Sequence, residues 1–464
     1  MPVLSKNLAR LPLFLLAIAE AGAVFVSVYL AQAFFLRVTS GSSLSIAPVA
    51  PDALFITAVM LLSLIAMGLY EFHQRIGIRQ VLTRVMVAIG LGSVVLGTAF
   101  LLVPWISIEP RVAGFAVVAV FVSISVIRLG FTRYFDRSMF KRRTIVLGAG
   151  ARCAPVSKLR RRADRRGFEI VASIPMPGDR ERGACEQLLV TDKTLPEIVK
   201  QTNANEIVIA MDDRRGALPF KQLLDCKLMG ISVIDMLEFL ERETGKISLD
   251  LIEPGWLILS PGFRTNRLRD FAKRTIDIIG ASMAVVLLAP VMAVIAAAIK
   301  LNEGLDAPML YRQRRVGRGG SEFLVLKFRS MRVDAEADGK ARWAEVDDDR
   351  ITPVGHLLRK YRADELPQLF NILRGDMSLV GPRPERPEFI ADLCEELPYY
   401  ANRHSVKPGL TGWAQLKYSY ASSTDDTREK LQYDLWYVKN HSMALDLMIL
   451  IQTAEVVIWG KGAR

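Results

Sequence analysis

The segment from Lys273 to Lys300 reads KRTIDIIGASMAVVLLAPVMAVIAAAIK, and its apolar part, Ile278–Ile299, is long enough to cross a membrane. Basic residues stand on both sides of it. Each Lys or Arg near an anionic cytoplasmic leaflet is stabilised by about 1 kcal/mol, so neither flank has a strong bias to cross. Pro290 removes one backbone hydrogen bond inside the helix and favours a kink. We therefore expect a re-entrant helix over about 275–300 that bends at Pro290 and returns to the same face, with a proline-kinked fifth span as the alternative.

Four further apolar stretches fill the first third of the chain. They are Leu11–Leu36, Ala50–Tyr70, Val81–Val103 and Ala113–Ile127. Crossing ~30 Å of hydrocarbon takes about 20 helical residues, which is close to the length of each stretch. Lys and Arg are concentrated at the two ends of this region and between the second and third stretches, so the positive-inside rule places both ends in the cytoplasm. We expect residues 1–140 to form a four-helix transmembrane region.

The overall composition also fits a membrane protein. The chain is 51% hydrophobic and has a formal net charge of +12. Such a basic balance suits either nucleic acid or an anionic leaflet, and the apolar segments favour anionic phospholipid over nucleic acid as the partner. The four cysteines form no CxxC pair, so we expect reduced thiols that serve packing. The four histidines form no HExxH motif, which argues against a zinc site.

The segment 141–240 alternates strand-like and helix-like stretches. Its first strand, Thr144–Leu147, is followed by the turn 148–150 with the sequence Gly-Ala-Gly, an order typical of a Rossmann-like parallel sheet. The dinucleotide fingerprint is incomplete, because its third position is Cys153. We therefore favour a module that binds no dinucleotide and serves assembly or regulation. Residues 241–267 are expected to link it to a last domain, 268–464.

Beyond residue 320 the sequence alternates acidic and basic residues inside otherwise apolar stretches. The motifs are KFRSM (327–331), Arg359-Lys360, DELPQ (364–368), GDMSLVGPRP (375–384) and KPGLTGW (407–413). Taken singly, each has a structural explanation, because a charge run is usually a solvated face and Pro-Arg-Pro is usually a rigid turn. Together they supply the carboxylates, Arg and Lys that a diphosphate and its metal ion require.

In order and spacing, these motifs and KRxxD (273–277) resemble the bacterial polyprenyl-phosphate hexose-1-phosphate transferases, the monotopic phosphoglycosyl transferase superfamily. The resemblance covers about residues 270–464. The preceding four spans and Rossmann-like module are similar to the large, multi-span members that initiate exopolysaccharide or O-antigen assembly. One departure is Ala289, where smaller members often have Ser before the proline. The resemblance implies a mainly α catalytic domain on the cytoplasmic side of the bacterial inner membrane, carried by a re-entrant helix.

For the chemistry, the resemblance implies covalent catalysis on a UDP-sugar. Asp364 attacks the β-phosphate and UMP leaves. Polyprenyl (undecaprenyl) phosphate then takes the sugar phosphate from the aspartyl intermediate and forms a polyprenyl diphosphate-sugar. The physical argument agrees, because a carboxylate nucleophile divides one displacement between two anions into two steps. Mg²⁺ is the expected cofactor and Glu365 its expected ligand, since magnesium prefers carboxylate oxygens.

Several basic residues are expected to bind phosphate. Arg383, stiffened by a proline on either side, is the candidate for a bidentate phosphate clamp. Lys327, Arg329 and Arg359 are expected to share the remaining negative charge, with lipid headgroups as the alternative partner for any one of them. Two roles are equally open for Asp376, which either contacts the nucleotide or caps the local turn.

Two other classes of function remain open at this point. A membrane-tethered nucleotide-sugar dehydratase or epimerase also joins spans to a Rossmann module, but no Tyr of this chain has the Lys four residues later that such enzymes need. A non-enzymatic membrane scaffold with a basic, lipid-binding face is the second alternative. The motifs do not specify which sugar is transferred, and a homo-oligomer is compatible with them.

Overall fold

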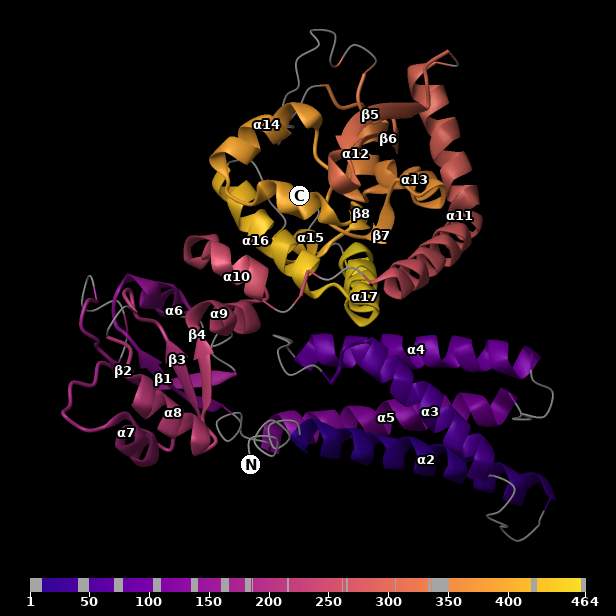
Figure 1. Cartoon of the computed structure of the whole chain (residues 1–464). Helices are drawn as coiled ribbons and strands as arrows, with labels where there is room; N and C mark the ends of the chain where they lie inside the picture. Colours follow the sequence, from indigo (N-terminus) through magenta and orange to yellow (C-terminus); the bar gives the residue numbers. More distant parts are fainter. Residues whose placement is uncertain are drawn as a thin grey trace. The chain divides into compact units, whose positions relative to one another are not determined.

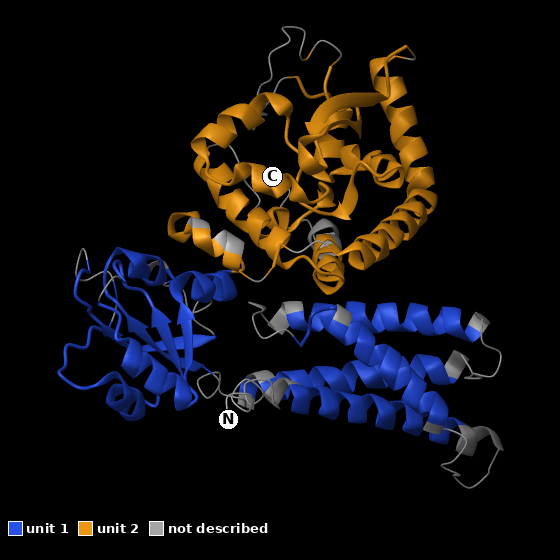
Figure 2. Cartoon of the chain, viewed as in Figure 1, with its two compact units in different colours: residues 1–244 blue, residues 245–464 orange. Residues whose placement is uncertain are grey.

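In the computed structural model the chain divides into two compact units, residues 1–244 and 245–464 (Figure 2). The structure describes residues 11–40, 50–70, 78–102, 110–134, 141–159, 167–179, 185, 187–214, 217–260, 262–263, 266–304, 306–332, 335, 350–418 and 424–459. Val103, the end of the third expected span, lies outside these ranges.

Apolar helices form the first part of unit 1. They are α2 (Leu11–Ser40), α3 (Ala50–Ala66), α4 (Ile78–Leu102) and α5 (Pro110–Tyr134), and they match the four expected stretches (Figure 1). In the described chain, parts of α2, α4 and α5 are long and apolar enough to cross a membrane, whereas the apolar run of α3, Pro51–Ile65, is shorter. Outward-facing residues such as Phe34 and Phe115 are about two-thirds exposed, a surface suited to hydrocarbon.

One acidic residue, Glu20, lies inside this helical region with no exposed surface. An unpaired acid at mid-bilayer costs about 2.5–3.5 kcal/mol. Arg128 of α5 donates from Nη2 to Oε2 of Glu20 at 2.9 Å, and the Tyr70 hydroxyl donates to the same carboxylate. The cost of the buried acid is therefore offset by an ion pair that joins α2 to α5.

The rest of unit 1 is an α/β domain with a parallel sheet in the order β2-β1-β3-β4. The strands are β1 (Arg142–Leu147), β2 (Phe168–Ile174), β3 (Glu206–Ile209) and β4 (Ser232–Asp235). The accompanying helices are α6 (Ala154–Lys158), α7 (Leu195–Thr202), α8 (Phe220–Leu228) and α9 (Met236–Thr244). Parallel strands alternating with helices confirm the expected α/β middle domain. Helix α9 continues to Thr244, so it occupies the first residues of the expected linker.

The glycine turn after β1 is closed by the domain's own carboxylates. Asp179 accepts a hydrogen bond from the amide of Ala149 at 2.8 Å. Asp212 accepts from the amides of Ala151 and Arg152 at 3.0 and 2.8 Å. In a dinucleotide-binding turn these amides face the pyrophosphate. Their use by Asp179 and Asp212 gives a physical reason to favour a module without a dinucleotide.

Two of the four cysteines are not the reduced thiols that the sequence predicts. Cys153 and Cys185 form a disulfide with their Cα atoms 6.0 Å apart, so the prediction of free thiols is wrong for these two. The chain after β2 folds back against this strand, where Ser173 and Leu188 form an isolated β-bridge. This brings Cys185 to the start of α6. Cys226 and Cys394 are free, as expected.

Unit 2 holds a mainly helical domain with two small sheets. Antiparallel β5 (Leu310–Val316) and β6 (Glu322–Phe328) form one sheet, and parallel β7 (Ser378–Val380) and β8 (Gly409–Thr411) form the other. The helices are α10 (Pro254–Leu259), α11 (Arg267–Glu303), α12 (Pro353–Lys360), α13 (Gln368–Arg374), α14 (Pro387–Glu396), α15 (Trp413–Lys417), α16 (Thr424–Asn440) and α17 (Met443–Trp459). Their shared core contains buried residues of α11, β6, α13, β7, α15, α16 and α17.

Helix α11 has 37 residues, with Pro290 inside it, and it curves around the rest of the domain (Figure 1). Its outward side chains are apolar, and Val286, Leu287 and Val294 are each about 70% exposed. An apolar surface of this extent fits hydrocarbon better than water. Together with α2, α4 and α5, α11 makes four helices in the described chain that are long and apolar enough to cross a membrane.

Charged residues fix the N-terminal part of α11 to the domain. Asp277 accepts hydrogen bonds at 3.0 Å from the hydroxyl of Ser378 and the amide of Leu379, both on β7. Arg274 donates to two carbonyl oxygens at the end of α13, and Lys273 pairs with an acid of α17. The KRxxD motif therefore attaches the N-terminal part of the apolar helix to the domain.

Candidate active site

Asp364 and Glu365 lie side by side in a short 3₁₀ turn between α12 and α13. The residue that enters this turn, Arg362, has a left-handed backbone with φ of 52°. Such a conformation costs a non-glycine residue about 1–3 kcal/mol, so the surrounding packing has to hold it. Both carboxylates are nearly buried, with 9% and 7% of their surface exposed.

The turn is packed against the second half of α11. Ala363 and Leu366, on either side of the acidic pair, join a cluster with Ile295 and Ile299 of the helix. The same cluster includes Leu358 of α12. The acidic pair is therefore anchored to the C-terminal half of the apolar helix.

Two cations converge on Glu365. The Arg383 Nη2 atom donates to Oε1 at 2.7 Å, and the Lys327 Nζ atom lies 3.6 Å from the same oxygen. Burial raises the pKa of Glu365, but Arg383 and Lys327 together lower it to about 2. Glu365 is therefore ionised at any physiological pH.

Asp364 has a different environment. Burial and the charge of Glu365 raise the pKa of Asp364, while Lys327, Arg383 and Arg359 lower it by less. No described residue forms a hydrogen bond with its carboxylate. A buried carboxylate without hydrogen-bond donors is poorly solvated, which makes it a stronger nucleophile than an exposed one.

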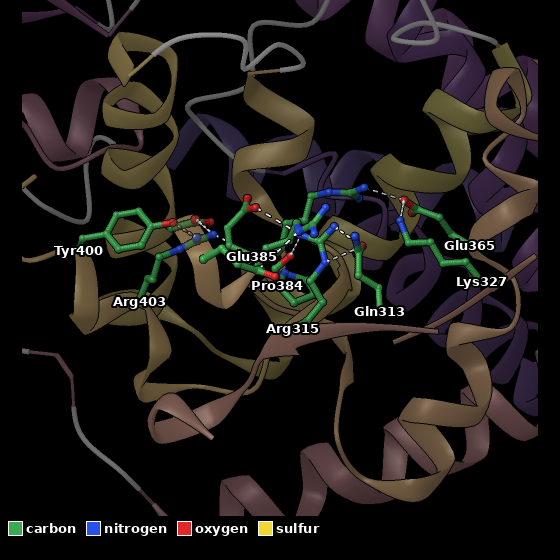
Figure 3. Close-up of polar contacts among 12 residues, drawn as sticks. Gln313, Arg315, Lys327, Glu365, Pro384, Glu385, Tyr400 and Arg403 are labelled. Atoms are coloured by element: carbon green, nitrogen blue, oxygen red, sulfur yellow. Dashed lines mark hydrogen bonds and ion pairs between the residues drawn. The ribbon is translucent and has the colours of Figure 1, made fainter. Parts of the chain in front are cut away.

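The loop that carries Arg383 is held in place by two arginines, the buried Arg403 and the partly buried Arg315. Arg403 donates to the main-chain oxygen of Arg383 at 2.9 Å and pairs with Asp434 at 2.7 Å. Arg315 donates to the main-chain oxygen of Pro384 at 3.1 Å. Figure 3 shows Lys327 and Glu365 at one end of this network and Arg403 at the other, with Arg315 between them. The loop position, and with it the Arg383 side chain, therefore depends on contacts made well away from the carboxylates.

Comparison of the sequence with known proteins identifies the family to which this chain belongs. The model of the bacterial sugar transferase family matches residues 268–460. A UDP-glucose:undecaprenyl-phosphate glucose-1-phosphate transferase of Caulobacter vibrioides is 40% identical over 205 residues, which are 44% of this chain and 76% of that protein. The chain belongs to the bacterial sugar transferase family.

Other members of the bacterial sugar transferase family match over longer segments. A UDP-N-acetylgalactosamine-undecaprenyl-phosphate N-acetylgalactosaminephosphotransferase of Aeromonas hydrophila is 42% identical over 245 residues, 52% of this chain and 56% of that protein. A UDP-glucose:undecaprenyl-phosphate glucose-1-phosphate transferase of Escherichia coli is 35% identical over 302 residues, 62% of this chain and 61% of that protein. This chain thus spans little more than half the length of either relative.

In this family member, the residues expected to bind phosphate fall into two groups. Lys327 and Arg383 contact the acidic pair, and Arg359, which donates to the Ser330 hydroxyl at 3.1 Å, lowers the pKa of Asp364. Arg329 instead donates to the carbonyl oxygen of Pro308 at 3.0 Å. Asp376 accepts from the Asn371 side chain at 3.3 Å, in the turn that follows α13, a placement that suits the turn-capping role.

The acidic pair fits a magnesium ion that arrives with a diphosphate. Within the described parts of the chain, no group of three or more His, Cys, Asp or Glu side chains is placed to hold a metal. Magnesium is usually held by one or two carboxylates together with substrate phosphates, so a larger group is not needed. Both cations at Glu365 contact Oε1, and no described residue binds its Oε2. That oxygen is the atom with which Glu365 could hold a metal ion.

Sequence reasoning missed Arg315, Arg403 and Asp434. Arg403 and Asp434 are almost fully buried, and Arg315 is mostly so. In the sequence, Arg315 belongs to a run of basic residues, whereas Arg403 and Asp434 stand outside every motif, and neither setting indicates a buried ion pair. Their partners are 20 to 70 residues away along the chain, so only the fold identifies them.

Proposed function

We propose that this protein transfers a hexose 1-phosphate from a UDP-sugar to polyprenyl (undecaprenyl) phosphate at the inner face of the bacterial cytoplasmic membrane. The products are a polyprenyl diphosphate-sugar and UMP. This is the first membrane step of exopolysaccharide or O-antigen assembly. The observation that carries the proposal is a buried, poorly solvated Asp364 beside an ionised Glu365 that Arg383 and Lys327 hold.

In the first step an oxygen of Asp364 forms a bond to the β-phosphorus of the UDP-sugar. The bridging P–O bond breaks, and its electron pair leaves with UMP. Arg383 and Lys327 are placed to neutralise the charge on the phosphate oxygens, because both already face a carboxylate oxygen at the same place. Glu365, whose Oε2 has no partner among the described residues, would hold magnesium, and the ion would supply positive charge to shield the diphosphate from the approaching carboxylate.

In the second step an oxygen of polyprenyl phosphate attacks the same phosphorus and the Asp364 carboxylate leaves. The acceptor is a lipid, so its phosphate must reach Asp364 from the membrane surface. The packing of the acidic turn on Ile295 and Ile299 of α11 supports this route, because it ties the nucleophile to the apolar helix. Two in-line displacements give net retention at phosphorus and leave the enzyme unchanged.

The test is UMP release by the purified full-length protein, with polyprenyl phosphate and a panel of UDP-hexoses and UDP-N-acetylhexosamines. We expect sustained UMP release for at least one sugar. Without the lipid acceptor, release should stop after about one UMP per enzyme, since the aspartyl intermediate then accumulates. A membrane scaffold or a nucleotide-sugar epimerase would release no UMP at all, and that result would contradict the proposal.

The pH dependence of turnover should report on Asp364. The nucleophile has to be ionised, and its pKa is raised above the usual 3.8, whereas Glu365 stays ionised down to about 2. The value of kcat/KM should therefore fall as the pH drops through a pKa above 3.8.

Arg383→Met should move this acid limb to higher pH, because Arg383 lowers the pKa of Asp364. Arg314→Met is the matched control and should leave the limb unchanged, because this exposed arginine pairs with Glu322 alone among the described residues. The check is kcat/KM against pH at constant ionic strength. A limb that stays in place in Arg383→Met would show that this guanidinium does not act on Asp364.

We further propose that α11 is re-entrant and bends at Pro290, so that both its ends and the catalytic domain face the cytoplasm. Its exposed apolar middle and the curvature around the domain support this topology. Single cysteines at Leu268→Cys and Leu301→Cys, both at exposed positions, provide the test in a background of Cys226→Ser and Cys394→Ser.

A membrane-impermeant maleimide should label both new cysteines in inverted vesicles and neither in intact spheroplasts. The native Cys394, which is exposed, reports the side of the catalytic domain when it alone is retained. Labelling of Leu268→Cys and Leu301→Cys from opposite sides would mean that α11 is a true span.

A further inference from the structure

A second basic site lies at the N-terminal end of α11, away from the acidic pair. It is a cavity of about 90 Å³ between the first turns of α11, the segment 405–407 and the end of α16. Its cationic lining residues are Arg269, Lys273, Arg274, Arg318 and Lys407. Two carboxylates, Asp270 and Asp277, also line it. Neither Asp364 nor any of the residues that contact the acidic pair belongs to this lining.

The carboxylates of this cavity are already engaged. Asp277 accepts its hydrogen bonds from β7, and Asp270 pairs with Arg318 at 3.5 Å. Lys273 forms an ion pair with Asp446 at 2.6 Å. Among the described residues, Arg274 donates to main-chain carbonyl oxygens alone, which carry no net charge. The cavity therefore keeps an excess of positive charge.

Lys407 is the cation of this cavity that has no direct partner in the described parts of the chain. No described residue forms an ion pair or a hydrogen bond with its Nζ atom. A Cβ placed on Gly375 would lie 3.4 Å from Arg274 Nη2 and 3.8 Å from Lys407 Nζ, so the two cations converge on one spot. Burial, Arg274 and Arg318 lower the pKa of Lys407, and Asp277 and Asp376 offset this only in part. An anion between Arg274 and Lys407 would relieve this repulsion.

The cavity also lies where α11 changes from basic to apolar. Its lining residues on the helix end at Asp277, and the apolar stretch begins at the next residue. On the same turns Leu268 and Phe271 are more than 70% exposed. When the apolar part of α11 lies in hydrocarbon, these side chains and the cavity lie at the level of the lipid phosphates.

We propose that this cavity binds the phosphodiester of an anionic membrane phospholipid such as phosphatidylglycerol, separately from the site of sugar-phosphate transfer. The acidic pair packs on the C-terminal half of α11, whereas the cavity uses its first turns. Helix α13 joins the two places, because Asp364 and Glu365 precede it and Arg274 donates to its last turn. A bound lipid phosphate thus secures the N-terminal end of α11 and, through Arg274, the helix that follows the nucleophile.

The experiment is native mass spectrometry of the full-length protein in a neutral detergent, titrated with phosphatidylglycerol. A detergent micelle removes the general attraction of a charged leaflet, so the count reports specific binding. We expect one tightly bound phosphatidylglycerol, with affinity reduced about tenfold or more in Lys407→Met. Arg318→Gln, at a half-exposed position, should show a smaller loss in the same direction and guards against a folding defect in the first variant.

Arg314→Gln is the matched control, because it removes an exposed arginine that does not line the cavity. It should change the affinity by less than about twofold. Equal affinities in Lys407→Met and Arg314→Gln would overturn the proposal. A competition result would also overturn it. If inorganic phosphate or polyprenyl phosphate displaces phosphatidylglycerol from the wild type but not from Lys407→Met, the cavity binds that competitor and is not a phospholipid site. UMP release, measured on the same preparations, tests the proposed transferase activity independently.

Discussion

Asp364→Asn is expected to reduce UMP release by on the order of 10⁴-fold or more, because an amide cannot attack phosphorus. The same variant should form no sugar-phosphoryl adduct. In the wild type, incubation with UDP-sugar in the absence of lipid should add the mass of one hexose phosphate to the protein. Intact-protein mass spectrometry measures this mass, and UMP release in the same samples measures turnover.

Asp392→Asn is the matched control, since Asp392 is an exposed acid on α14 of the same domain. It should retain both turnover and adduct. The substitution at Asp364 should also leave the fold intact, because the wild-type carboxylate has no hydrogen bond from the described residues to lose. Near-normal UMP release from Asp364→Asn would exclude this residue as the nucleophile.

Arg403→Met is expected to destabilise the catalytic domain by about 3–5 kcal/mol, the usual cost of leaving one partner of a buried ion pair. Asp434 would lose its 2.7 Å partner while only 3% exposed. The main-chain oxygen of Arg383 would lose a donor as well, so the loop that carries this arginine should loosen and turnover should fall. Thermal unfolding in detergent and steady-state UMP release measure the two effects.

A double variant separates stability from positioning. Arg403→Met with Asp434→Leu removes both charges, and replacing a buried ion pair by apolar side chains is often neutral or better for stability. We expect the double variant to regain most of the lost stability but not the turnover, because the oxygen of Arg383 still lacks its donor. If turnover returns together with stability, Arg403 supports the fold only and does not position Arg383. Arg314→Met, at an exposed ion pair, should change both by little.

The elements that rest on local patterns were predictable from the sequence. Long apolar runs gave α2 to α5 and α11, and the strand, glycine turn and helix order gave the parallel sheet. The acidic pair was predictable because Asp364 and Glu365 are adjacent, and because their motif recurs in a known family. Hydrophobic periodicity and the adjacency of two residues are visible in the linear sequence, so these features can be predicted without knowledge of the fold.

Contacts between residues that are far apart in the sequence were not predictable. Arg128 is 108 residues from Glu20, and Arg315 is 69 residues from Pro384, so no window of sequence joins them. The disulfide of Cys153 and Cys185 depends on how the chain after β2 folds back. The carboxylates that close the glycine turn are likewise supplied from other loops. In each case the sequence contains the side chain, but only the fold supplies its partner.

The ion pair between Glu20 and Arg128 has a consequence for how this protein is made. A ribosome adding about 5–20 residues per second needs roughly 5–20 s to extend the chain by the 108 residues that separate them. During that interval α2 carries an acid without its counter-ion. It should therefore stay beside the translocon, or in a shallow position, until α5 emerges. Release of α2 into lipid is then coupled to the arrival of α5, which makes insertion of this bundle a concerted event.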